Sequence, residues 1–333
     1  MWSFQHSDLK MKHLVSIDLL RGIAAFFIVG CHLQLLDYTP GAKLLLSCCD
    51  MNVGVFAAIS GFMMKRNEVD CLWIDYVLRR GYRLFPAYIF WTVLYLCASA
   101  IYQCYFGMGL KSRFREGGFW VEVIFLGAGA THLWYLICLF YAQCIVFPVR
   151  KYLKGGIGLL VSFGFAWAIS FYQTWFTLYP CRLFSFMVLG WVIGGVCSRI
   201  MCSRGRVYMI CGILVLAAIV RCRIWFSLPV YVNDWICVGA VMLFFVGLEN
   251  NLDRGKEAKT LNWFVKWLGC TSMGVFCVHP LVTVIGARLI KSFFGAGPYD
   301  IGITLMLWWG AWMGALMITI ILLRIRGIRR VVQ

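Results

Sequence analysis

The feature that most constrains the fold of this chain is a succession of apolar runs, each about twenty residues long and nearly free of charge. Of its 333 residues, 62% are hydrophobic and only 14% are charged, and the mean hydropathy is +0.81. A helix of about 20 apolar residues crosses the roughly 30 Å hydrocarbon core of a bilayer, and soluble domains are far less apolar. We therefore predict an all-α, polytopic transmembrane helical bundle that forms a single domain over residues 1–333.

Ten spans are predicted, with tails at residues 1–15 and 324–333. Their expected bounds are 16–36, 44–64, 84–107, 132–149, 156–176, 180–198, 207–228, 230–249, 261–287 and 301–323. A shorter apolar stretch at 119–130 suits an interfacial or re-entrant segment better than a crossing. The chain is thus expected to pass through the membrane an even number of times.

The positions of lysine and arginine set the expected orientation. With a cytoplasmic N-terminus, most of the 31 basic residues fall on the inner side, as the positive-inside rule requires, and an extra span at 119–130 would reverse that bias. Both termini are therefore predicted to be cytoplasmic, in the inner (cytoplasmic) membrane. Orientation signals and anionic lipid headgroups account for the net charge of +17, so membrane lipids are expected partners and nucleic acid is not.

The 16 cysteines are scattered singly, apart from Cys48-Cys49, and they have no spacing suited to zinc. Most lie inside predicted spans, where cysteine is a small apolar residue. We expect neither a metal site nor a disulfide framework.

Arg21 and His32 stand inside the first predicted span, where ionisable side chains are costly and usually face a bundle interior or a wet cavity. Their spacing is three helical turns plus about 20°, so both lie on one face of a helix, about 16 Å apart along its axis. Asp18, three residues before Arg21, can pair with it. The structural alternative is an arginine that snorkels to headgroups and a histidine that bonds to a neighbouring helix.

This pair of side chains suits a transfer reaction. A histidine, with an ordinary pKa of about 6.5, can abstract a proton at neutral pH, and an arginine binds phosphate. Together they describe a site that takes a charged donor from the cytosol and activates an acceptor hydroxyl. Arg21 and His32 are the candidate catalytic residues.

Five stretches, in order along the chain, carry a resemblance to a known family. They are SIDLLRGIAAFFIVGCHL (16–33), NVGVFAAISGFMMKR (52–66), YVLRRGYRLFPAY (76–88), THLWYL (131–136) and LGCTSMGVFCVHPLV (268–282). In this arrangement the chain resembles the acyltransferase 3 family of integral-membrane enzymes from residue 16 to about 323. It departs from the family in one place, because residues 137–141 lack the acidic residue that often follows the fourth stretch.

The resemblance implies a membrane O-acyltransferase that uses acyl-CoA, by expectation acetyl-CoA, as co-substrate. The acceptor would be a hydroxyl of a cell-surface glycan, polysaccharide or lipid-linked sugar, with His32 as general base or, in a covalent route, as the acylated group. Arg79, Arg80 and Arg83 would bind the CoA phosphates, although topology signalling explains these arginines equally well. Pro86 is expected in the first turn of the third span.

Five further residues are candidates for substrate binding. They are Asp50, His132, Trp134, Tyr135 and His279. Asp50 is the nearest acidic residue that could orient His32, whereas membrane aromatic belts and helix packing are alternative explanations for the others. Ser60 and Gly61 are expected to permit close helix approach rather than to perform chemistry.

Two other classes of function remain open on sequence grounds. A transporter or flippase could use the same polar face as a path for a small solute or a lipid-linked sugar, and a structural subunit could use it for helix packing. The chain shows no obvious inverted repeat, which counts against the transporter. The sequence does not indicate an oligomeric state.

Overall fold

The computed structural model describes most of the chain, and within that part the fold is all helical. The described residues are 14–33, 36–47, 49, 51–64, 71–106, 133–152, 155–169, 175–200, 207–213, 215, 230–252, 258–325 and 327–328. The named helices are α1 (Val15–Cys31), α2 (Pro40–Ser47), α3 (Asn52–Phe62), α4 (Trp73–Phe106), α6 (Trp134–Tyr152), α7 (Gly155–Ile169), α8 (Trp175–Ile200), α10 (Val230–Leu252), α11 (Ala258–Phe294) and α12 (Ile301–Arg324). An isolated bridge between Tyr38 and Tyr299 is the β contact in these ranges.

Four helical stretches among the described residues are long and apolar enough to cross a membrane. They are Tyr231–Glu249, Trp263–Phe294, Ile301–Arg324 and, with α2 and α3 taken together, Pro40–Phe62. The predicted all-α membrane bundle is therefore confirmed. The number of spans and the side on which the termini lie stay predictions.

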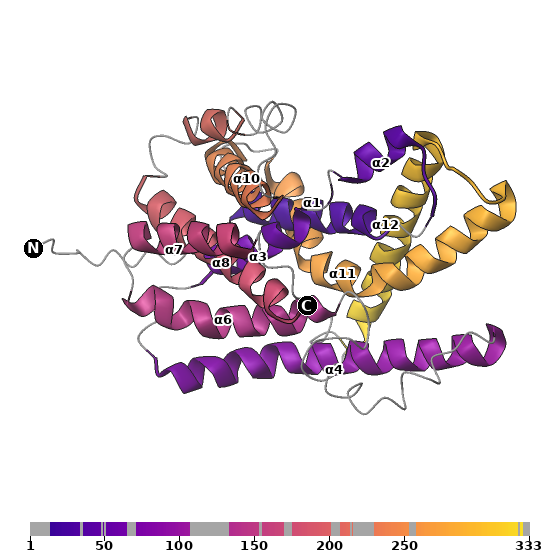
Figure 1. Cartoon of the computed structure of the whole chain (residues 1–333), viewed down its shortest axis with the longest axis horizontal. Helices are drawn as coiled ribbons and strands as arrows, with labels where there is room; N and C mark the ends of the chain where they lie inside the picture. The colour runs from indigo at the N-terminus through magenta and orange to yellow at the C-terminus, as the bar shows by residue number, and fades with distance from the viewer. Residues whose placement is uncertain are drawn as a thin grey trace, which may run out of the picture.

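Helix α1 lies in the middle of the molecule, with α4 and α6 side by side below it and α11 and α12 towards one end in the view of Figure 1. It packs against α2, α3, α10, α11 and α12. Close approach to α11 depends on glycine in both helices. A Cβ on Gly22 would lie 2.2 Å from the Leu268 side chain, and a Cβ on Gly269 would lie 2.7 Å from the Cβ of Asp18.

These contacts also fix the relative direction of α1 and α11. Gly22 meets Leu268 near the start of α1, and His32 meets His279 at its end, so the two helices run parallel. A first and a ninth span that both run from the inner to the outer side of the membrane would also be parallel. The observed direction therefore agrees with the alternation expected from the sequence.

The N-terminus of α1 is capped by a side chain from a distant helix. The preceding Leu14 has no capping group, but Glu249 near the end of α10 accepts hydrogen bonds from the backbone N–H of Val15 (3.2 Å) and of Ser16 (2.7 Å). A carboxylate at this position satisfies two otherwise unpaired donors and complements the positive end of the helix dipole. It joins the end of α10 to the start of α1.

Several predicted spans differ from the observed helices, and α11, for example, continues to Phe294 beyond the predicted residue 287. Span 16–36 is too long, because α1 ends at Cys31 and the N–H of His32 turns back to the Val29 carbonyl (3.2 Å). Span 44–64 is two helices, α2 and α3, with a break around Cys49 and Met51. Helix α4 begins well before the predicted residue 84, so Pro86 lies inside a helix and not in a first turn. The segment 119–130 lies outside the described residues.

Candidate active site

His32 lies where α1 ends, and its ring meets that of His279 on α11. The ring centroids are 4.8 Å apart and the ring planes are inclined by 49°. Gly30 makes room for this crowded helix end, because a Cβ there would come within 2.8 Å of both Trp308 and Cys49. Two histidines that are 247 positions apart in sequence thus lie in contact in the fold.

His279 is completely buried, and its tautomer follows from its surroundings. Its Nδ1 lies 3.2 Å from the carbonyl oxygen of Val275. Because a carbonyl only accepts, we assign the proton to Nδ1, which leaves the lone pair of the neutral ring on Nε2. Thr283 secures the same turn by donating from its hydroxyl to the His279 carbonyl at 2.8 Å. The hydrogen bond at Nδ1 fixes the orientation of the His279 ring.

A row of rings leads from His279 towards Arg21. Phe276 lies 6.0 Å from His279 and 5.2 Å from Tyr135, measured between ring centroids. The Tyr135 hydroxyl forms a hydrogen bond with the Ser60 side chain, and the phenol lies within reach of the Arg21 charge. Four helices, α1, α3, α6 and α11, therefore contribute side chains to one polar and aromatic seam.

Arg21 occupies the end of the seam nearer the start of α1. Its Nη1 lies 3.7 Å from Oδ1 of the buried Asp18, and one third of the Arg21 side chain (33%) remains exposed. This separation describes an ion pair without bidentate geometry. The guanidinium can therefore still bind an anion such as a phosphate.

The structure brings together most of the predicted site residues that it describes. Arg21, His32, Tyr135 and His279 belong to the seam, and Trp134 packs edge-on against Tyr135 with ring centroids 6.3 Å apart. Asp50 and His132 lie outside the described residues, so their predicted roles stay predictions. The expectation for Gly61 is confirmed, because a Cβ on Gly61 would lie 1.9 Å from the Met187 carbonyl oxygen.

The three arginines of α4 differ in their surroundings. Arg79 and Arg83 are exposed, whereas Arg80 is half-buried with its guanidinium over the ring of the buried Tyr76, 5.1 Å from the centroid. Arg79 and Arg83 lie one helical turn apart, on one face of the helix. In this part of the molecule α4 packs mainly on α6.

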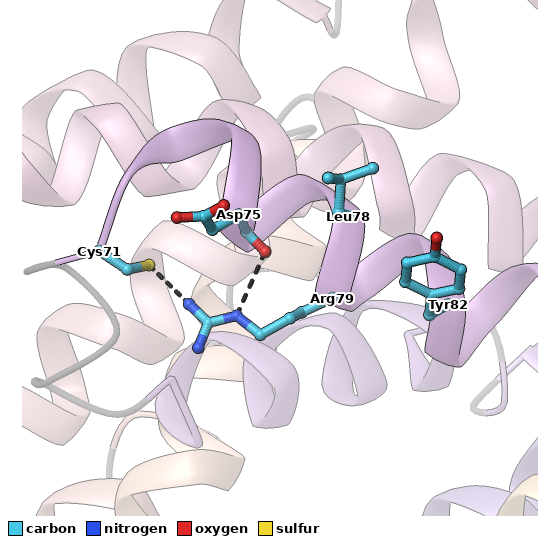
Figure 2. Close-up of a pocket in the computed structure, with 5 residues that line it drawn as sticks. All are labelled: Cys71, Asp75, Leu78, Arg79 and Tyr82. Atoms are coloured by element: carbon cyan, nitrogen blue, oxygen red, sulfur yellow. Dashed lines mark hydrogen bonds between the residues drawn. The ribbon is translucent and has the colours of Figure 1, made fainter.

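Figure 2 shows an open pocket at the start of α4, with a volume of about 370 Å³. Its lining residues are Cys71, Asp75, Leu78, Arg79 and Tyr82. Arg79 donates from Nε to the Asp75 carbonyl (3.2 Å) and from Nη2 to the Cys71 sulfur (2.7 Å). The pocket is built from α4 and from Cys71, two residues before it, so the arginine cluster and the seam are separate places on the molecule.

Sequence reasoning missed a buried ion pair between α8 and α10. Arg182 Nη2 donates to Asp234 Oδ2 at 2.8 Å, and the Arg182 guanidinium lies 4.8 Å from the centroid of the Tyr231 ring. Both charges fall inside predicted spans. The rule that singled out Arg21, that ionisable groups within a span are costly, would have found them.

The fold and the seam together define a class: an integral-membrane protein with a buried polar site around its central helix. The sequence model of the acyltransferase 3 family, described as an acyltransferase domain, matches residues 14–324, which is nearly the whole chain. The chain belongs to this family and is a membrane acyltransferase. No match was found among the curated proteins or among the solved structures.

Proposed function

We propose that this protein is a multi-pass enzyme of the inner (cytoplasmic) membrane that transfers an acyl group, most simply acetyl, from cytosolic acyl-CoA to a hydroxyl. The acceptor in this proposal is a cell-surface glycan, a polysaccharide or a lipid-linked sugar. The observation that carries it is the contact between the rings of His32 and His279 at the end of α1, 4.8 Å between centroids. Membership of the acyltransferase family supplies the reaction class.

In the proposed reaction His32 is the general base. Its ring nitrogen removes the proton from the acceptor hydroxyl, the oxygen attacks the thioester carbonyl, and the carbon–sulfur bond breaks. The proton held by the imidazole then passes to the departing CoA sulfur, so the products are the acyl ester and free CoA thiol. The buried His279, with its fixed tautomer, keeps the His32 ring in place.

The charged residues have a complementary role in this proposal. Arg21 attracts the anionic donor to the inner end of the seam, and Asp18 keeps its side chain along α1. Arg79 and Arg83, both exposed on α4, bind the phosphates at the adenosine end of CoA. Trp134 and Tyr135 line the path of the acceptor, with Asp50 and His132 as further candidates.

The decisive test compares His32→Gln with His13→Gln, a histidine of the predicted N-terminal tail. Purified protein is incubated with radiolabelled acetyl-CoA and crude glycan or lipid-linked sugar, and labelled ester is measured. We expect His32→Gln to reduce transfer by about 10²–10⁴-fold, the usual contribution of a general base, and His13→Gln to leave it unchanged. Undiminished transfer by His32→Gln would overturn the assignment, and solute transport without acyl transfer would favour a transporter.

A further inference from the structure

Tyr95 of α4 contacts α11 at the turn that carries His279. Its hydroxyl donates to the backbone carbonyl of Cys277 at 2.7 Å, two residues before His279. The side chain is partly buried and packs against the hydrophobic core. A side chain of α4 is thus bonded directly to the backbone of α11.

The turn of α11 that Tyr95 contacts also carries a proline. Pro280 lies inside the helix and has no backbone N–H to donate to the carbonyl four positions earlier. A proline within a helix is a known cause of bending. The Tyr95 hydrogen bond and the proline therefore act on the same turn of α11.

The same turn determines where His279 lies. His279 immediately precedes Pro280 and is completely buried, so its ring cannot move independently of the backbone. Its contact with His32 depends on the path of α11 beside α1. Loss of the hydrogen bond at the Cys277 carbonyl would therefore alter the relation between the two imidazole rings.

We propose that Tyr95 is a positioning residue for the transfer reaction. Its hydrogen bond to the Cys277 carbonyl fixes this turn of α11 against α4, and it thereby holds His279 against His32. Tyr95 does not touch the reacting atoms in this proposal. The inference rests on the proposed function, in which His32 is the base.

The test is Tyr95→Phe, which removes the hydroxyl and keeps the ring. The matched control is Tyr88→Phe, because Tyr88 is a buried tyrosine of the same helix. Steady-state kinetics are measured per folded enzyme with acetyl-CoA, together with thermal unfolding. We expect Tyr95→Phe to lower kcat by about 10- to 100-fold, as for a small misplacement of reacting groups, with the KM for acetyl-CoA within about twofold.

A second variant checks the route of the effect. Pro280→Ala restores an N–H to α11, and we expect it to lower kcat as well. Combined with Tyr95→Phe it should cost little more than either change alone, since both act on one turn. Wild-type kcat in Tyr95→Phe, a loss equal to that of Tyr88→Phe, or additive losses in the double variant would overturn the proposal. Activity that survives His32→Gln would instead refute the proposed function.

Discussion

At the scale of single residues, the arginines of α4 differ in their surroundings and therefore in their expected roles. The helix turns Arg79 and Arg83 outward and lays Arg80 over Tyr76. An exposed guanidinium is available to a phosphate, whereas a guanidinium over an aromatic ring also supports the packing beneath it. The cluster is therefore not uniform, although the sequence RRGYR suggests that it is.

We predict a corresponding division among three glutamine variants. Arg79→Gln and Arg83→Gln should each weaken CoA binding by about tenfold, the value of a charge-assisted hydrogen bond, without changing the unfolding midpoint. Arg80→Gln should lower the free energy of unfolding by about 0.5–1 kcal/mol. Calorimetric titration with CoA and thermal unfolding measure the two effects. Lys43→Gln, an exposed cation paired with Asp37, is the control, and equal behaviour of all three variants would contradict the division.

At the scale of elements, helix packing depends on glycines that sit against backbone. Where α3 crosses α8, a Cβ on Gly61 would lie 1.9 Å from the Met187 carbonyl oxygen, and a Cβ on Gly190 would lie 1.9 Å from that of Ala58. Carbonyls cannot rotate away as a flexible side chain can. This reciprocal contact explains the glycine of the SGF stretch as a requirement of packing, as in other small-residue helix interfaces.

We predict that Gly61→Ala and Gly190→Ala each destabilise the folded protein by about 1–3 kcal/mol or more, the range for overpacked sites. Gly164→Ala on α7 is the matched control, because a Cβ there meets no atom within 4 Å. Thermal unfolding in detergent, monitored by intrinsic tryptophan fluorescence, gives the comparison. A Gly61→Ala protein as stable as the control would show that the two helices can separate at little cost.

Hydropathy predicted the extent of several elements closely, and its failures have physical causes. Span 301–323 corresponds to Ile301–Arg324, because its whole length is apolar. The first half of α4 is helical but carries charge, so an apolar run cannot reveal it. The break near Cys49 lies in apolar sequence and leaves hydropathy unchanged.

The site was only partly predictable for a related reason. Arg21 and His32 could be placed on one face from local helix geometry. The contact of His32 with His279 arises from parallel packing of α1 and α11, and no periodicity along the chain records such a long-range pairing. The role of Tyr95 depends on the same packing, and an isolated tyrosine in an apolar run gives no signal.

At the scale of the whole molecule, α10 joins two groups of helices through buried charge. Asp234 near its start pairs with Arg182 of α8, and Glu249 near its end caps α1. Removing one partner of a buried pair leaves an uncompensated charge, which is usually worse than removing both. The stability of the helix bundle therefore depends on Arg182 and Asp234 together.

We predict that Asp234→Leu lowers the free energy of unfolding by about 3–5 kcal/mol and that the double variant Arg182→Met with Asp234→Leu recovers most of that loss. Chemical unfolding of the purified protein in detergent, with the two single variants and the double variant in parallel, measures the coupling. A double variant no more stable than Asp234→Leu alone would mean that the pair acts through more than its mutual charge.

Helix α1, which ends at Cys31, sets the distance between Arg21 and His32. The two residues lie about 16 Å apart along the helix axis. In the proposed reaction, a donor whose phosphates bind at the Arg21 guanidinium reaches the imidazole rings only through a flexible chain of similar length. The pantetheine portion of CoA is such a chain, so we expect shortened thioesters that lack it to be poor substrates.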